Sequence, residues 1–254
     1  MRYAKGGLVI NADRDIPLLW QVRNSRFVSH QQLFDFMKFG GFDHCRTSFN
    51  WRARRLVGSG YLSICEGVFG AGSFVYRITR EGLAVLEHHG QFTTVLHSNT
   101  VHLPHVSQVF HSLQLNAIQL ALARKNLLVR WQSEIEIASL NTISRTPYQK
   151  DYDAVVDVWI GEKRACFALE YERSLKSSKQ YERVRRALEC ERQIGCVLYL
   201  TSGVEILVHL VHEFESVTMN LAFANARDFA HLLLDTRVIT GRNTSGMTFR
   251  EILQ

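Results

Sequence analysis

The sequence predicts an α/β protein made of two domains, residues 1–92 and 93–254. In the first part, three helix patterns are followed by a hairpin pattern and a fourth helix pattern. In the remainder, apolar strand patterns alternate with helix patterns. Positive charge is concentrated in the first part. Residues 1–92 hold 12 Lys and Arg against 7 Asp and Glu, a net charge of +5, and residues 93–254 hold 18 against 17, a net charge of +1. The first domain is therefore expected to bind a polyanion.

The composition of the chain excludes several classes of protein. The chain has 254 residues, of which 46% are hydrophobic, so it can bury a sizeable core. No apolar run approaches the eighteen or so residues that a membrane-spanning helix needs, so no membrane partner is expected. The N-terminal residues are too charged for a secretory signal, which predicts a cytoplasmic protein. Five cysteines without a Cys-x-x-Cys pair indicate reduced thiols rather than a disulfide framework.

The first domain begins with three helix patterns. Residues 15–28 carry apolar side chains at helical spacing, and Ser29 is suited to cap a second helix over residues 30–39. A third helix is predicted over residues 48–60, capped by Thr47 or Asp43. Its buried stripe is expected to consist of Phe49, Ala53 and Leu56.

The opposite face of this third helix is basic and polar. It carries Ser48, Trp51, Arg52 and Arg55, with Arg46 and Arg54 on its flanks. Strands are predicted over residues 61–65 and 74–79, joined by the glycine-rich turn 67–73, and Thr79 is expected to cap a last helix over residues 80–89. This order of helices and strands is that of a winged helix-turn-helix domain.

A helix with one apolar face and one Arg, Ser and Trp face fits the major groove of DNA, where side chains contact base edges. The sequence thus predicts double-stranded DNA as the partner. The expected contact residues are Arg46, Ser48, Trp51, Arg52 and Arg55, with Arg77 and the hairpin on the backbone or minor groove. In the alternative interpretation, the basic helix packs on another protein. Because many such domains read two half-sites as dimers, a homodimer is compatible with this pattern.

The second domain is predicted to be a mixed α/β sheet covered by helices. A long amphipathic helix is expected over residues 104–126. The strands and helices that follow are expected at 127–138, 153–160 and 165–171 (strands), 174–193 (helix), 196–202 (strand), 204–215 (helix), 218–224 (strand) and 227–234 (helix). Over residues 235–254, the sequence predicts a last strand and a tail.

Four acidic residues in this domain alternate with apolar ones. Asp153 and Asp157 have the same parity on one strand, and Glu170 and Glu172 have the same parity on the next. Like charges on neighbouring strands repel unless a cation lies between them, and carboxylates at strand ends suit Mg²⁺. The alternative is an ordinary strand face with acidic decoration.

Three motifs carry a resemblance to a known family. They are Trp131-Gln132-Ser133-Glu134, Tyr152-Asp153 and Glu170-Tyr171-Glu172. With their element order, they resemble the restriction-endonuclease-like PD-(D/E)XK superfamily. From about residue 15 to residue 235, the chain resembles the replication-relaxation family of plasmids and other mobile elements, in which a winged helix precedes such a core. The resemblance implies that Asp153 and Glu170 ligate Mg²⁺ or Mn²⁺ with the Tyr171 carbonyl, and that Glu134 adds a carboxylate or holds a water.

The chain departs from the superfamily pattern at Glu172, which stands where a lysine is expected. Either Glu172 is a further metal ligand, or a lysine on the next helix, Lys179, reaches back toward Glu170. Lys176, Lys179, Arg183 and Arg186 share one face of that helix, and Lys176 is a candidate DNA contact. The alternative is a solvated face balanced by nearby glutamates.

Two functions of different class follow. The first is a DNA-binding protein of plasmid or mobile-element type that controls replication or transcription without cutting DNA, which the loss of the lysine favours. The alternative is a metal-dependent DNA endonuclease using Asp153 and Glu170. A weaker third interpretation is a protein-recruitment factor. The endonuclease kinship requires that residues 134, 153 and 170 converge.

Overall fold

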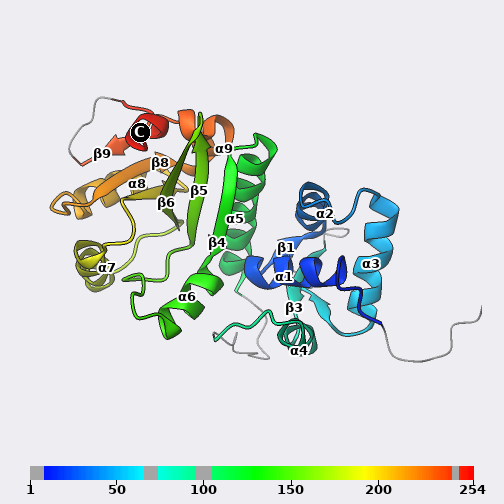
Figure 1. The fold of residues 1–254 in the computed structure, drawn as a ribbon. Helices are drawn as coiled ribbons and strands as arrows, with labels where there is room; N and C mark the ends of the chain where they lie inside the picture. The colour runs from blue at the N-terminus through cyan, green and yellow to red at the C-terminus, as the bar shows by residue number, and fades with distance from the viewer. Residues whose placement is uncertain (1–8, 66–73, 95–104, 242–245) are drawn as a thin grey trace, which may run out of the picture. The chain divides into compact units, whose positions relative to one another are not determined.

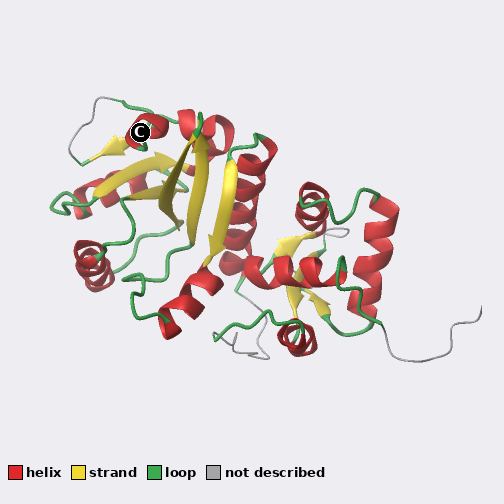
Figure 2. Cartoon of the chain, in the orientation of Figure 1, coloured by secondary structure: helices red, strands yellow, loops and turns green. Residues whose placement is uncertain are grey.

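The computed structural model describes residues 9–65, 74–94, 105–241 and 246–254. The chain divides into two compact units, Met1–Asn116 and Ala117–Gln254, called here the first and second units, and the division falls within α5 (Val106–Arg124). Figure 1 labels most of the elements of each unit, and Figure 2 shows helices and strands in both. Over the described ranges, the chain forms no helix with the length and apolar character needed to cross a membrane.

The first unit contains helices around a small sheet. In chain order its elements are α1 (Asp15–Ser25), β1 (Val28–Ser29), α2 (His30–Phe39), α3 (Arg46–Gly58), β2 (Leu62–Ile64), β3 (Val75–Ile78) and α4 (Arg80–His88), followed by the start of α5. The three strands are antiparallel in the order β1-β3-β2. The sequence predicted this order apart from the two-residue strand β1. The predicted glycine-rich turn 67–73 lies outside the described residues.

Local capping explains where the helices of the first unit begin. The Ser29 side chain accepts a hydrogen bond from the backbone N–H of Gln32, whose side chain accepts from the N–H of Ser29. Thr79 Oγ1 accepts from the N–H of Gly82, and a Cβ atom at Gly82 would lie 2.3 Å from the carbonyl oxygen of Tyr61, so this approach requires glycine. Both predicted caps are confirmed.

The third helix has the predicted buried stripe but not the predicted cap. Phe49, Ala53 and Leu56 are at most 1% exposed. The N-cap residue is Cys45, without a side-chain capping bond, and Thr47 lies inside the helix. The expected cap by Thr47 or Asp43 was therefore wrong; Asp43 binds side chains of the helix, as described below.

The second unit is built on one six-stranded sheet in the order β4-β5-β6-β7-β8-β9. Its elements after α5 are β4 (Leu128–Ser133), α6 (Glu134–Ile143), β5 (Ala154–Ile160), β6 (Lys163–Glu172), α7 (Ser178–Cys190), β7 (Cys196–Thr201), α8 (Val204–Glu213), β8 (Asn220–Asn225), α9 (Ala226–Leu232), β9 (Ile239–Thr240) and α10 (Phe249–Ile252). Strands β4, β5 and β6 are antiparallel, β6, β7 and β8 are parallel, and β9 is antiparallel to β8. The predicted mixed α/β sheet is confirmed.

Helices cover both faces of this sheet. On one face, Tyr181 and Leu188 of α7 and Phe214 at the end of α8 pack with strand residues such as Val197 and Phe223. On the other face, Phe249 of α10 lies 4.9 Å from Phe167 of β6 between ring centroids, and it also meets Phe229 of α9. Residues of opposite parity on the same strand therefore meet different helices.

The strand predicted over residues 127–138 was partly wrong, because a helix begins inside it. The Ser133 side chain accepts from the backbone N–H of Glu136, and the Glu136 carboxylate accepts from the N–H and hydroxyl of Ser133. This reciprocal cap starts α6 at Glu134. Glu134 is thus the first residue of a helix that directly follows β4, and not a residue within a strand.

Candidate functional site

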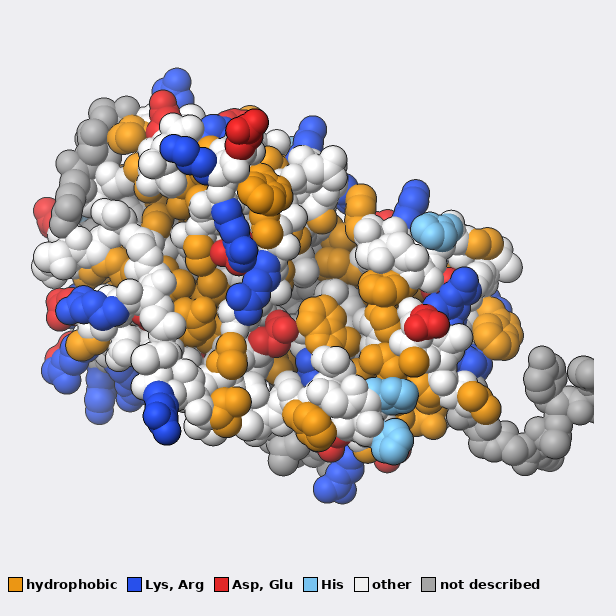
Figure 3. All heavy atoms as spheres, viewed as in Figure 1, with side chains coloured by type: hydrophobic (Ala, Val, Ile, Leu, Met, Phe, Trp, Pro, Cys, Tyr) orange, Lys and Arg blue, Asp and Glu red, His pale blue; other side chains and the backbone are white. Residues whose placement is uncertain are grey.

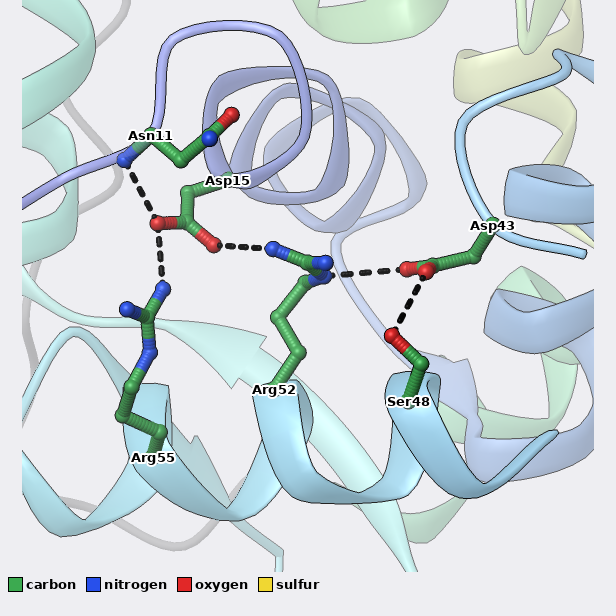
Figure 4. A network of polar contacts seen from close by, with 6 residues as sticks. All are labelled: Asn11, Asp15, Asp43, Ser48, Arg52 and Arg55. Carbon is green, nitrogen blue, oxygen red and sulfur yellow. Dashed lines mark hydrogen bonds and ion pairs between the residues drawn. The ribbon is translucent and has the colours of Figure 1, made fainter. Parts of the chain in front are cut away.

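A buried ion network organises the first unit. Arg52 Nη1 lies 3.0 Å from Asp15 Oδ1, and Arg52 Nε lies 2.9 Å from Asp43 Oδ2. Arg52 is 5% exposed and both aspartates are at most 2% exposed. Figure 4 shows the Arg52 guanidinium between the two carboxylates, so that one side chain of α3 ties down the start of α1 and the loop before α3.

Three residues of the predicted DNA-contact face belong to this network. Arg52 cannot contact DNA, because its guanidinium is buried between two acids; this prediction was wrong. Arg55 also pairs with Asp15, and the Ser48 hydroxyl donates to Asp43 Oδ1 over 3.4 Å. The side of α3 that carries these residues therefore serves to hold the first unit together, as Figure 4 shows.

The exposed side of α3 is rotated from the predicted one. Thr47, Trp51 and Arg54 are exposed, Asn50 is half-buried, and these four residues follow the i, i+3, i+4, i+7 spacing of one helical face. Trp51 is 62% exposed. The charge of this face comes from Arg54, and α3 itself contains no acidic residue.

Two further predicted cations have uncharged partners. Arg46 donates to Gln31 Oε1 over 2.9 Å, and its guanidinium lies 4.7 Å from the centroid of the Phe34 ring. Arg77 Nε on β3 donates to Ser63 Oγ over 3.0 Å. Because these partners bear no charge, both arginines keep their positive charge available to an anion.

In the second unit, strand register brings the predicted acids to neighbouring positions. Ala154 of β5 pairs with Leu169 of β6, which sets Asp153 beside Glu170. The backbone N–H of Glu134 donates to the carbonyl oxygen of Asp153 over 3.2 Å. The backbone at residues 134, 153 and 170 therefore converges where β4 ends, β5 begins and β6 ends.

Each acid has a partner from the chain. Asp153 Oδ2 accepts a hydrogen bond of 2.7 Å from the backbone N–H of Tyr171. Ion pairs join Glu170 to Lys150 and Glu172 to Lys176. The remaining acid of the predicted set, Asp157, pairs with Arg164 on the neighbouring strand. The chain's own cations thus supply the charge compensation that the predicted repulsion requires.

Glu170 is the most perturbed of these groups. It is 5% exposed, and burial raises the pKa of its carboxyl to about 7, although the Lys150 ammonium acts to lower that pKa. Asp153 adds to the rise through repulsion, and Lys176 opposes it. The charges of Asp153, Lys150 and Lys176 therefore all act on Glu170. The name carboxylate–lysine cluster is used here for six residues: Glu134, Lys150, Asp153, Glu170, Glu172 and Lys176.

Lys150 was not identified from the sequence, and it stands where Lys179 was expected to act. Lys179 lies exposed in the first turn of α7, while Lys176 precedes that helix. Lys150 comes from the loop before β5, and its Nζ also lies 4.9 Å from the centroid of the Tyr152 ring. The available signal was its position three residues before Asp153, in a stretch that looks like an ordinary polar loop.

A second buried carboxylate holds the loop that carries Lys150. Glu191 is 5% exposed, and its Oε2 accepts from the backbone N–H of Gln149 over 3.0 Å and from the Tyr152 hydroxyl over 3.2 Å. Its Oε1 accepts from the backbone N–H groups of Arg192 and Gln193. Glu191 thus holds the loop before Lys150 at the backbone of Gln149 and after it through the side chain of Tyr152.

Two buried polar atoms on the same face of the sheet lack a partner within the described part of the chain. They are Gln132 Nε2 on β4 and the Tyr199 hydroxyl on β7, where Tyr199 pairs with Glu170. Burial, and then the charge of Glu170, raise the pKa of Tyr199 well above its usual range, so it stays a donor. Unsatisfied buried donors beside carboxylates are groups that a water or hydrated ion could satisfy.

The described residues contain no group of three or more His, Cys, Asp and Glu side chains placed to hold a metal ion. Figure 3 shows Lys and Arg side chains gathered over α7, at the lower left of the view. The exposed cations of that helix include Lys179, Arg183 and Arg186. A cationic surface therefore lies on the helix that directly follows Lys176.

Comparison with known proteins gives weak similarity only. No family model and no curated protein matches the chain. Two solved structures of the restriction endonuclease FokI, one of them described as bound to DNA, match 85% and 86% of this chain at 12% identity, with TM-scores of 0.27 and 0.28. The chain spans 43% and 42% of their length. A TM-score below 0.5 does not establish a shared fold.

Proposed function

We propose that the first unit is a winged-helix domain that binds double-stranded DNA through the exposed side of α3. The observation that carries this proposal is the division of arginines on one helix. Arg52 and Arg55 are neutralised by buried acids, whereas Arg54 is exposed and Arg46, within the described part of the chain, contacts the uncharged side chains of Gln31 and Phe34. A helix that keeps a positive and polar outer face, with no acid on it, is suited to a phosphate-lined groove.

The roles of the side chains follow from their positions. Arg54 and Arg46 would neutralise phosphates and release counterions, and Arg77 on β3 would do the same on the adjoining backbone. Asn50 and Trp51 lie between those arginines on the helix surface and would meet base edges. Phosphate contacts would set the register of the helix, and the two central side chains would discriminate among bases.

Fluorescence anisotropy with a labelled duplex in chelator tests this proposal. Arg54→Ala and Trp51→Ala should each weaken binding, while Arg227→Ala, which removes one exposed arginine from α9, should leave it near wild type. Equal losses in Arg54→Ala and Arg227→Ala would show that net charge alone matters. Absence of wild-type binding at low salt would end the proposal.

We further propose that binding without cleavage is the primary activity, as in a regulator of replication or transcription of a mobile element, and that a homodimer reads two half-sites. The support is that both buried glutamates of the carboxylate–lysine cluster are occupied by lysines of the chain itself. Sedimentation of the protein with and without duplex measures the dimer directly. A single copy bound at saturation would exclude it.

A metal-dependent endonuclease is the second candidate, favoured by one observation. Glu134, Asp153 and Glu170 occupy neighbouring positions, and Lys150 supplies a lysine beside them. Asp153, Glu170 and the Tyr171 carbonyl are the oxygen donors that would hold Mg²⁺ or Mn²⁺, an ion that polarises a phosphodiester and activates water. Gln132 Nε2 and the Tyr199 hydroxyl, which have no partner among the described residues, fit such a hydrated site.

If the protein is an endonuclease, lysines of the carboxylate–lysine cluster would bind the negatively charged phosphate. Lys150 and Lys176 would turn from the glutamates toward a bound phosphate, and Glu134 would hold a water. Because both lysines are bound to glutamates, an incoming ion and phosphate together must replace two ion pairs. This exchange makes activity dependent on metal concentration.

Nicking of supercoiled plasmid in Mn²⁺ tests the second candidate, with Asp153→Asn as the variant. Asp157→Asn is the matched control, because it makes the same change within β5, which begins directly after Asp153, but at an acid that pairs with Arg164. Loss of nicking in the first variant alone supports the candidate. Wild-type protein that binds DNA but never nicks it would leave only the regulator.

A further inference from the structure

His30 connects the interior of the first unit to the exposed side of α3. His30 Nδ1 lies 2.8 Å from the Tyr76 hydroxyl, and Nε2 lies 2.9 Å from Asn50 Oδ1. His30 is the first residue of α2. The centroid of its imidazole ring lies 5.0 Å from that of the Phe49 ring and 5.8 Å from that of the Tyr76 ring. With both nitrogens bonded and aromatic rings around it, the imidazole has one fixed orientation.

The protons of this chain of contacts can be assigned. Tyr76 is 4% exposed, and burial raises its pKa, so its hydroxyl keeps its proton. Burial also lowers the pKa of His30, and Arg46 and Arg54 lower it further, although the bond with Asn50 raises it, so the imidazole is neutral. A neutral imidazole has one N–H and one acceptor nitrogen. If Tyr76 donates to Nδ1, the N–H is on Nε2 and donates to Asn50 Oδ1.

This bond determines what Asn50 offers to the outside. The amide oxygen is turned toward the half-buried His30, and the amino group, on the other side of the amide, is turned away from it. Paired contact with adenine needs the oxygen and the nitrogen of asparagine to face the base together. Asn50 held in this way presents donors only.

Resting on the proposed binding of DNA through α3, we infer that Asn50 is a specificity-determining residue that donates to a guanine edge, and that His30 and Tyr76 enforce this by holding the amide oxygen. Guanine presents two neighbouring acceptors, N7 and O6, in the major groove. Cytosine presents an amino donor there and would be rejected at this position. Arg46 and Arg54, which both act on His30, add positive charge around the same acceptors.

Selection from a pool of duplexes with randomised positions tests the inference. Wild type should select guanine at one position, by about threefold to tenfold over cytosine, the ratio expected of one neutral hydrogen bond. Asn50→Asp presents acceptors in place of donors and should exchange guanine for cytosine or adenine there. Asn50→Ala should lose the preference without acquiring another. His30→Phe frees the amide oxygen and should admit adenine.

Each outcome decides between the inference and the function on which it rests. If wild type and Asn50→Asp select the same bases, the inference fails and DNA binding stands. If the wild-type protein binds no duplex from the pool, both the inference and the proposed DNA binding fail. Nitrogen-15 NMR of the free protein supplies a readout that needs no DNA. Protonation of His30 at Nε2 is expected, and protonation at Nδ1 would overturn the assignment.

Discussion

Asp15 and Arg52 lie 37 residues apart in the chain and make a buried ion pair, with 3.0 Å between Oδ1 and Nη1. Asp15 is the first residue of α1, and Arg52 lies in the middle of α3. The pair therefore fixes the angle between two helices of the first unit. It also removes Arg52 from any surface, which leaves Arg54 and Arg46 as the outward cations of α3.

The first prediction separates structural from DNA-binding arginines by stability. Arg52→Ala should lower the free energy of unfolding by about 3–5 kcal/mol, because it leaves two buried carboxylates without their cation. Arg54→Ala should change it by less than about 0.5 kcal/mol, since its side chain is exposed. Urea unfolding followed by circular dichroism measures both. Similar stability in the two variants would contradict the burial of Arg52.

The second prediction concerns pH. Because burial lowers the pKa of His30 below its usual value of 6.5, the unfolded chain takes up this proton before the folded protein does. The contribution of His30 to stability is therefore complete above pH 6.5 and is lost as the pH falls toward the folded pKa. His30→Gln, which does not titrate, should show a smaller loss of stability between pH 7 and pH 5. Parallel unfolding curves for the two proteins would contradict this.

The third prediction concerns Lys150 and Glu170. Lys150→Met should destabilise the protein at pH 8, by roughly 3 kcal/mol, since it leaves a buried carboxylate without its partner. At pH 5 the loss should be smaller, because the pKa of Glu170 is raised to about 7 and the carboxyl is then protonated. Adding Glu170→Gln to Lys150→Met should restore most of the stability at pH 8. A pH-independent loss would contradict the pairing.

The fourth prediction concerns the loop that carries Lys150. Glu191→Ala should lower the free energy of unfolding by about 1–3 kcal/mol, because it leaves buried donors, among them the N–H of Gln149, without an acceptor. Hydrogen exchange at the Gln149 amide should accelerate more than exchange in β7. Exposed Glu189, in the last turn of the helix that Glu191 follows, provides the matched control, and Glu189→Ala should leave that amide protected. Equal exchange in both variants would show that Glu191 does not hold the loop.

Much of the fold could be predicted because it depends on local pattern. The stripe of Phe49, Ala53 and Leu56 follows from helical spacing, and the caps at Ser29 and Thr79 follow from local side-chain chemistry. The apolar runs of β5 to β8 likewise identify buried strands. The start of α6 was missed although its capping signature, Ser133 followed by Glu136, is present in the sequence.

The sites depended on long-range partners and could be predicted only in part. Residues 153 and 170 were placed together correctly, because strand parity and a tight turn at Gly161 constrain them. The burial of Arg52 depends on Asp15, and helical spacing alone does not reveal an acid from another helix. Lys150 reaches Glu170 from a loop whose path is set by Glu191, and no local pattern encodes that path.

The salt dependence of duplex binding tests the central claim most directly. Removal of both outward cations in an Arg46→Ala/Arg54→Ala variant should reduce the slope of log K against log salt by roughly 1.8, which is two phosphate contacts at about 0.9 each. Wild type and Arg227→Ala should share the steeper slope. An unchanged slope in the double variant would contradict binding of DNA by the exposed side of α3.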